Sequence, residues 1–171
     1  HIKKHRPIPA GQISLIRATL LIPVLLAAAF AIATMVPSKE FLVIFTIYYL
    51  FTLAYSFWLK SIPLVDVQML SILYTLRVVA GAYAASLPVS FWLLAFSLFF
   101  FFSLALLKRY TELKNTKQTN TLIGRGYTTN DHQFILIAGI SSAFLSVFIF
   151  MLYTQAGTNL DGLPRAEILG L

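Results

Sequence analysis

The run FWLLAFSLFFFFSLALL, residues 91–107, decides the fold class of this chain. It is uncharged and almost entirely apolar, and Lys108 and Arg109 follow it directly. A helix that crosses a bilayer needs about 20 predominantly apolar residues, and only helices and closed barrels satisfy every backbone polar group in hydrocarbon. We therefore expect a transmembrane helix over Val89–Leu107 that ends at the two cations.

The composition of the whole chain agrees with a membrane protein. Of its 171 residues, 58% are apolar and 11% are charged, with a mean hydropathy of +0.81. A soluble domain carries about 25% charged residues, so a soluble globular protein is not expected. The expected fold is an all-α, polytopic transmembrane helix bundle with five helices. The four further spans are Ala18–Val36, Phe41–Leu59, Ile62–Leu87 and Phe134–Tyr153.

The cations divide unequally between the two sides that five alternating spans create. Ten Lys and Arg residues fall on the side of the N-terminal segment and the Lys108–His132 loop, two fall on the other side, and Arg77 lies within a span. Cytoplasmic loops are enriched in Lys and Arg. We therefore expect both basic segments in the cytoplasm beneath the inner or plasma membrane, and the tail Thr154–Leu171 on the opposite side. On such a protein the excess indicates topology and anionic ligands, and not nucleic acid.

Two basic motifs would meet at this cytoplasmic face. The first is KKHRPIPAGQIS, residues 3–14, in which two prolines hold the cations in an extended stretch. The second is Lys108-Arg109, with Glu112 one helical turn later. Lysine offers phosphate a point charge and arginine offers it a planar fork of donors. On local evidence an ordinary basic flank of a transmembrane helix is favoured for each motif. The order RPIPAG in the first motif and the shared membrane surface of the two motifs favour phosphate binding, so both interpretations stay open.

Ionisable residues inside the third expected span form a further candidate site. Asp66, Tyr74 and Arg77 fall on one helical face, with Asp66 and Arg77 about 16 Å apart along the axis, too far to pair. Charged residues within a span usually belong to a functional site or a buried polar network. Asp66 lines a polar site near the cytoplasmic mouth or belongs to such a network. For Arg77 a structural partner on another helix is favoured over substrate contact, and Tyr74 lines a cavity or has a structural role.

Other signals for chemistry are weak. Gly124-Arg125-Gly126-Tyr127 could bend the backbone around a phosphate, but we favour a plain flexible loop. The chain contains no nucleotide-binding glycine motif, no HExxH zinc motif and no identifiable Ser/His/Asp set. The absence of cysteine excludes a disulfide framework, a thiolate metal site and a cysteine nucleophile.

Taken together, these segments resemble the UbiA superfamily of intramembrane prenyltransferases. KKHRPIPAG, residues 3–11, is similar to the segment that follows the family's first aspartate-rich motif. LYTLRVVAG, residues 73–81, and LKRYTEL, residues 107–113, resemble the branch of decaprenyl-phosphate phosphoribosyltransferases and proteins that fuse a haloacid-dehalogenase-like domain to a UbiA domain. The resemblance covers residues 3–153. We therefore expect a partial UbiA-type transmembrane domain at 1–153 and an unassigned tail at 154–171.

The resemblance implies about nine transmembrane helices around a cavity open to the cytoplasm, of which these would be the third to seventh. It implies transfer of phosphoribose from phosphoribosyl pyrophosphate to a polyprenyl phosphate, with Mg²⁺ and release of pyrophosphate. Prenyl transfer from a polyprenyl diphosphate to an aromatic acceptor, and a non-catalytic polytopic membrane protein, are the alternatives.

The resemblance also assigns roles to individual residues. It implies that the diphosphate of the donor is held by Lys3, Arg6, Lys108 and Arg109. It places Glu112 next to the donor or its Mg²⁺, with Asp66 nearby. The first aspartate-rich motif, which supplies most of the Mg²⁺ ligands, is absent from this sequence. We therefore expect this polypeptide on its own to be inactive.

Overall fold

The computed structural model describes residues 14–115, 126–127 and 131–160, with side chains for all of these except 15, 17, 18, 115 and 156–160. Over the described residues the chain is helical, which confirms the expected all-α fold class. The α-helices are α1 (Leu15–Thr34), α2 (Lys39–Phe57), α3 (Val65–Ala84), α4 (Phe91–Asn115) and α5 (His132–Leu160). A short 3-10 helix, η2 (Leu59–Ser61), joins α2 to α3.

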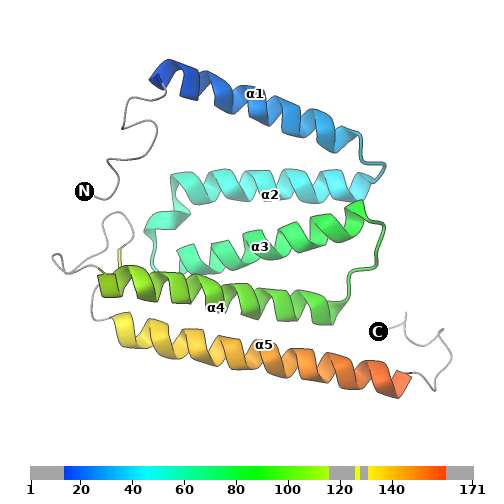
Figure 1. Ribbon diagram of the computed structural model, residues 1–171, viewed down its shortest axis with the longest axis vertical. Helices are drawn as coiled ribbons and strands as arrows, with labels where there is room; N and C mark the ends of the chain where they lie inside the picture. Colours follow the sequence, from blue (N-terminus) through cyan, green and yellow to red (C-terminus); the bar gives the residue numbers. More distant parts are fainter. Residues whose placement is uncertain (1–13, 116–125, 128–130, 161–171) are drawn as a thin grey trace.

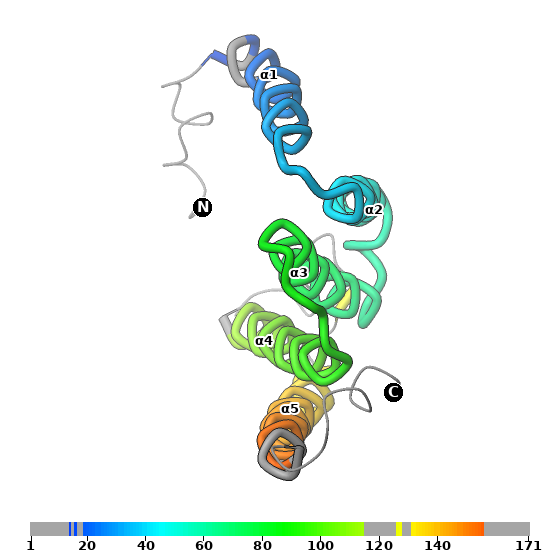
Figure 2. The backbone as a smooth tube through the Cα atoms, turned by 90° about the vertical axis from the view of Figure 1, so that its right-hand side faces the viewer, coloured from blue at the N-terminus to red at the C-terminus, as the bar shows by residue number. Residues whose placement is uncertain are grey.

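The five α-helices lie side by side in chain order, and each runs antiparallel to the one before it (Figure 1). Seen close to end-on, they form an open, staggered row (Figure 2). α4 packs between α3 and α5, and α2 packs on the other side of α3. Because the row is open, large apolar side chains such as Phe57 and Phe144 are exposed, as expected for helices surrounded by lipid or by further helices.

Four of the helices are long and apolar enough to cross a membrane. The first expected span, Ala18–Val36, corresponds to α1, in which the apolar part found within the described residues, Thr19–Thr34, is shorter. The chain is therefore an integral membrane protein. The four candidate spans are Lys39–Phe57, Val65–Ala84, Phe91–Lys114 and His132–Gln155.

The third expected span is shorter at its start than its apolar pattern predicts. The helix begins at Val65 and not at Ile62, because Pro63 and Leu64 form a turn. Leu64 adopts φ +64°, in the left-handed region that side chains other than glycine rarely occupy. This turn leads the chain from η2 into α3 and places Asp66 in the first turn of the helix.

Two helices run farther than their apolar patterns predict. α4 continues from Leu107 to Asn115, because the segment KRYTELKN, residues 108–115, consists largely of residues that tolerate a helix and contains an ion pair one turn apart. α5 continues from Tyr153 to Leu160, into the segment expected to be a tail. The candidate residues that follow the fourth span therefore lie on the last two turns of a helix.

The best-packed part of the bundle lies where the start of α3, the end of α4 and the start of α5 meet; we call this region the polar end. Val67, Leu106, Leu113 and Ile135 form its apolar core together with Tyr127 from the α4–α5 connection. This core fixes the three helices relative to one another and surrounds the charged residues described next.

Candidate functional site

A buried ion pair joins α3 to α4 at the polar end. Arg109 Nε donates to Asp66 Oδ2 at 2.6 Å, and both side chains are completely buried. Charges removed from water are tolerated only when they are paired and hydrogen-bonded. The ion pair therefore links the end of α4 to the first turn of α3.

Glu112 binds the same guanidinium from one turn farther along α4. Arg109 Nη1 donates to Glu112 Oε2 at 2.6 Å, and the Glu112 side chain is 34% exposed. One guanidinium thus faces two carboxylates, which gives the three residues a net formal charge of −1. The remaining nitrogen, Arg109 Nη2, is buried and has no hydrogen-bond partner within the part of the chain that the structure describes.

Tyr127 completes this arrangement from outside the helices. Its hydroxyl donates to Asp66 Oδ1 at 2.5 Å and accepts a hydrogen bond from the N–H of Leu64 at 2.7 Å. Burial raises the pKa of the Tyr127 hydroxyl above its ordinary value, and the hydrogen bond to Asp66 acts in the same direction. The hydroxyl is therefore held in its protonated, donating form. We call Asp66, Arg109, Glu112 and Tyr127 the buried polar group.

Gly126 allows the backbone of the segment Gly126–Tyr127 to approach Ser61 and Pro63 closely. It adopts φ +66°, and a Cβ atom there would lie 3.0 Å from side-chain carbons of Pro63 and 3.1 Å from the carbonyl oxygen of Ser61. Sequence reasoning favoured a flexible loop here and missed Tyr127 as a site residue. The available signal was the glycine that precedes the tyrosine, because glycine is the residue that permits a left-handed turn in contact with another backbone.

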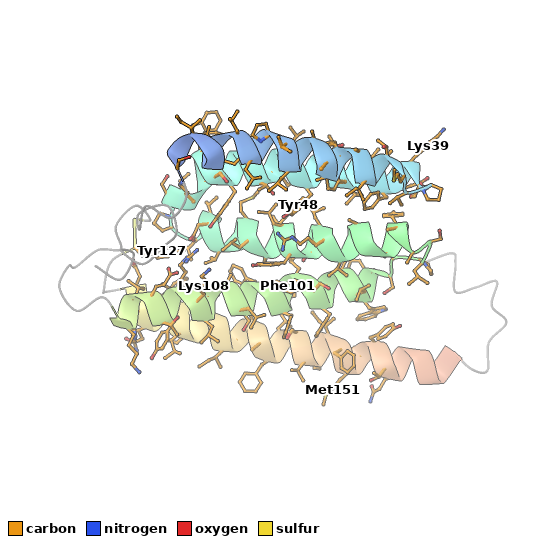
Figure 3. All side chains as sticks on the ribbon, turned by 45° about the horizontal axis from the view of Figure 1, so that its top comes forward. Lys39, Tyr48, Phe101, Lys108, Tyr127 and Met151 are labelled. Carbon is orange, nitrogen blue, oxygen red and sulfur yellow. The ribbon has the colours of Figure 1, made fainter. Side chains whose placement is uncertain are left out.

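Arg77 and Tyr74 lie farther along α3 and face other neighbours. Arg77 donates to the Tyr48 hydroxyl on α2 from Nε at 3.0 Å and from Nη2 at 2.5 Å. Its guanidinium carbon lies 5.2 Å and 5.3 Å from the ring centres of Tyr48 and Tyr74. Tyr74 in turn packs against Phe101 of α4. Figure 3 shows Tyr48 and Phe101 midway along the bundle, away from the polar end.

The cations expected to hold a diphosphate have different surroundings. Lys108 is exposed, whereas its neighbour Arg109 is completely buried. Figure 3 shows Lys108 and Tyr127 at one end of the bundle and Lys39 at the other. Lys3 and Arg6 lie outside the described residues. Lys108 is adjacent in sequence to the buried Arg109 and, unlike it, has an exposed side chain.

The described residues do not make a Mg²⁺ site by themselves. Among them, no three His, Cys, Asp or Glu side chains lie close enough to hold a metal ion. Asp66 binds Tyr127 with one oxygen and Arg109 with the other. Mg²⁺ requires oxygen ligands in a nearly octahedral arrangement, and the partly exposed Glu112 supplies only one such carboxylate.

Comparison with known proteins shows which family this chain is similar to. The sequence profile described as the UbiA prenyltransferase family matches residues 1–160. Protein y4nM of Sinorhizobium fredii is 39% identical over 153 residues, which are 88% of this chain and 30% of that protein. The nodulation protein NoeC of Azorhizobium caulinodans is 31% identical over 162 residues, which are 94% of this chain and 52% of that protein.

A third relative is named as an enzyme. The decaprenyl-phosphate phosphoribosyltransferase of Mycolicibacterium smegmatis is 30% identical over 136 residues, which are 78% of this chain and 42% of that protein. The chain therefore spans between 30% and 52% of the length of these three relatives.

Proposed function

Because this chain belongs to the UbiA prenyltransferase family, we propose that it forms part of a membrane transferase that moves phosphoribose from phosphoribosyl pyrophosphate to a polyprenyl phosphate. A relative with that type of name, 30% identical over 136 residues, supports the choice of substrates. The observation that carries the proposal is the end of α4, where Lys108 is exposed beside the Arg109–Glu112 pair. An exposed ammonium beside a single partly exposed carboxylate suits a diphosphate better than a cluster of exposed carboxylates would.

The proposed reaction is a displacement at C1 of the ribose. An oxygen of the polyprenyl phosphate forms the new bond to C1, the bond from C1 to pyrophosphate breaks, and its electron pair leaves with the pyrophosphate. No atom is oxidised or reduced. The protein must therefore supply positive charge next to the leaving group and keep water away from C1.

Lys108 and Arg109 would contribute to this reaction in different ways. The Lys108 ammonium is exposed and can contact the diphosphate directly. Arg109 uses Nε and Nη1 for its two carboxylate partners, which leaves Nη2 as its one donor for a ligand. Because Nη2 is buried among the described residues, the accessible positive charge is that of Lys108. Lys3 and Arg6 would add positive charge from the N-terminal segment. Glu112 would contact the ribose hydroxyls or the metal of the donor.

The sidedness of the protein and its metal requirement belong to the same proposal. We propose that the polar end faces the cytoplasm, where phosphoribosyl pyrophosphate is made available to it. The cations of the described residues support this, because Lys60, Lys108 and Lys114 belong to elements that end there, whereas Lys39 lies at the opposite end. A Mg²⁺ requirement is typical of the family, and its ligands would come mainly from outside the described residues.

The test is transfer of labelled phosphoribose by the full-length protein in lipid nanodiscs. With phosphoribosyl pyrophosphate, decaprenyl phosphate and Mg²⁺, we expect labelled lipid together with pyrophosphate, and neither product after chelation with EDTA. Lys108→Gln should raise the KM for the donor about tenfold, because it removes one charge-assisted contact. Lys114→Gln is the matched control, since Lys114 is exposed on the last turn of the same helix.

The alternatives give different products. Transfer of a labelled prenyl group to an aromatic acceptor, without transfer of phosphoribose, would overturn the proposed substrates. Binding and transfer that are absent for both donors would favour a non-catalytic membrane protein. Equal effects of Lys108→Gln and Lys114→Gln on the KM would contradict the role given to Lys108.

A further inference from the structure

Tyr127 belongs to the connection between α4 and α5, yet it packs where three helices meet. Its side chain is 1% exposed and contacts the cluster of Val67 from α3, Leu106 from α4 and Ile135 from α5. The segment Gly126–Tyr127 also borders a depression of about 320 Å³ that Pro63 and Leu64 line from the other side. The segment Gly126–Tyr127 is therefore held against the start of α3 by a buried aromatic side chain.

The Tyr127 hydroxyl replaces the cap that α3 lacks. Leu64 precedes the helix without a side-chain cap, and its N–H finds an acceptor in the Tyr127 oxygen at 2.7 Å. The same hydroxyl then donates its proton to Asp66 Oδ1 at 2.5 Å. An unpaired N–H at this partly buried helix start would be unfavourable, so the hydroxyl satisfies two groups at once.

A continuous series of hydrogen bonds leads from this hydroxyl to the proposed donor site. Tyr127 binds Asp66 Oδ1, Asp66 Oδ2 binds Arg109 Nε, and Arg109 Nη1 binds Glu112. Asp66 and Arg109 are completely buried, and bonds in such surroundings are stronger and more sensitive to a missing member than bonds in water. The orientation of the guanidinium plane, and hence the direction of Nη2, depends on where Asp66 is held.

We infer that Tyr127 is a positioning residue, which docks the segment Gly126–Tyr127 on the start of α3 and thereby fixes Asp66, the Arg109 guanidinium and, through the guanidinium, Glu112 at the site of the diphosphate-bearing donor. The effect on the donor rests on the proposed function. The effect on Arg109 does not, and the two can be measured separately. Tyr127 touches no reacting atom in this scheme and acts through Asp66.

The structural arm of the test uses Tyr127→Phe in the full-length protein in nanodiscs. Hydrogen exchange of the Leu64 amide and of the Arg109 Nε–H is followed by NMR, and an Arg109→Lys variant assigns the arginine signal. Both rates should rise about tenfold, the factor for one lost hydrogen bond to a charged or buried group. Tyr110→Phe is the control, because it removes a hydroxyl from a half-buried ring on α4 that packs against His132.

A second variant disturbs the contact between Gly126–Tyr127 and the start of α3 while keeping the Tyr127 hydroxyl. Gly126→Ala places a Cβ atom 3.0 Å from Pro63 at a φ of +66°, so it should push the segment away from α3 and raise the same two exchange rates. If Leu64 exchanges faster but the Arg109 Nε–H is unchanged in both variants, Tyr127 is only a packing residue and the inference is overturned. Unchanged Leu64 exchange in Tyr127→Phe overturns the docking itself.

The functional arm separates positioning from general damage. Tyr127→Phe should raise the KM for phosphoribosyl pyrophosphate about tenfold with little change in kcat, because it misorients a binding group. If Tyr127→Phe speeds up the hydrogen exchange of Arg109 Nε–H but leaves the KM for phosphoribosyl pyrophosphate unchanged, the inference is contradicted. If the unaltered protein transfers no phosphoribose, the proposed function fails, and the Arg109 exchange rate alone decides whether Tyr127 positions the guanidinium.

Discussion

Replacing Asp66 by Asn should destabilise the protein more than any other single removal of a carboxylate from the described residues. The substitution keeps the shape of the side chain but removes one charge from an ion pair whose two members are completely buried. Arg109 cannot recover its lost partner from water, because its side chain has no exposed surface. The expected consequence is a guanidinium that loses its completely buried partner and keeps only Glu112, whose side chain is partly exposed.

The contacts of the buried polar group set the size of this effect. Removing one partner of a buried ion pair costs about 3–5 kcal/mol. Glu112 still neutralises Arg109 across 2.6 Å, and the new amide oxygen can accept one of the two hydrogen bonds that Asp66 accepted. We therefore expect a loss at the lower end of that range, about 3 kcal/mol.

The loss can be measured by unfolding in mixed micelles of SDS and a mild detergent. Trp58 and Trp92 provide the fluorescence signal, because the chain contains no other tryptophan. Glu40→Gln is the matched control: it removes a carboxylate that is exposed, and it should cost less than about 0.5 kcal/mol. The double variant Asp66→Asn with Arg109→Gln removes both charges and should be more stable than the sum of the two single losses predicts, by about 1.5 kcal/mol or more.

Two results would refute this reasoning. The first is an Asp66→Asn variant within about 0.5 kcal/mol of the unaltered protein, which would mean that Glu112 alone is a sufficient partner for the buried Arg109. The second is strict additivity of the two single variants, because residues in direct contact should couple.

Two further predictions concern Tyr48 and the pH dependence of stability. Tyr48→Phe removes the acceptor for Arg77 and should cost about 1 kcal/mol, at the low end for a charged hydrogen bond because Arg77 is exposed, whereas Tyr49→Phe should have a smaller effect in the same unfolding assay. Because the pKa of Tyr127 is raised on folding, its contribution to stability is present below about pH 10 and decreases as the pH rises above that value. The difference in unfolding free energy between the unaltered protein and Tyr127→Phe should therefore shrink from about pH 9 to about pH 11, and a constant difference would contradict it.

The helices could be predicted from the sequence because the signal for them is local. A run such as residues 91–107 contains nearly all the information that a spanning helix requires, namely length and apolar side chains. The predicted helix boundaries were less accurate where a polar contact extends a helix or an unusual backbone conformation shortens it. α4 runs on to Asn115, where Arg109 and Glu112 stabilise its last turns, and α3 starts late because Leu64 adopts a left-handed conformation.

The buried polar group could not be assembled from the sequence because its members are distant in the chain. Asp66 and Arg109 are 43 residues apart, and Tyr127 lies 61 residues from Asp66. The sequence marked Asp66 as an unusual charge within a span, but it gave no partner for it. The distance along the axis excluded Arg77, and the remaining cations were indistinguishable until α3 and α4 were seen to pack side by side.

Lys108 and Arg109 show why adjacent residues of the same charge need not share a role. Successive residues on a helix point about 100° apart, so only one of the two can face α3. Arginine suits that position, since its planar fork can satisfy Asp66 and Glu112 together, which a lysine ammonium does less well. The outward position then falls to Lys108, whose compact charge suits the contact with a diphosphate that we propose for it. In the unfolding assay, Lys108→Arg should therefore lower the free energy of unfolding far less than Arg109→Lys, although both substitutions keep the charge. Equal losses for the two variants would contradict this reasoning.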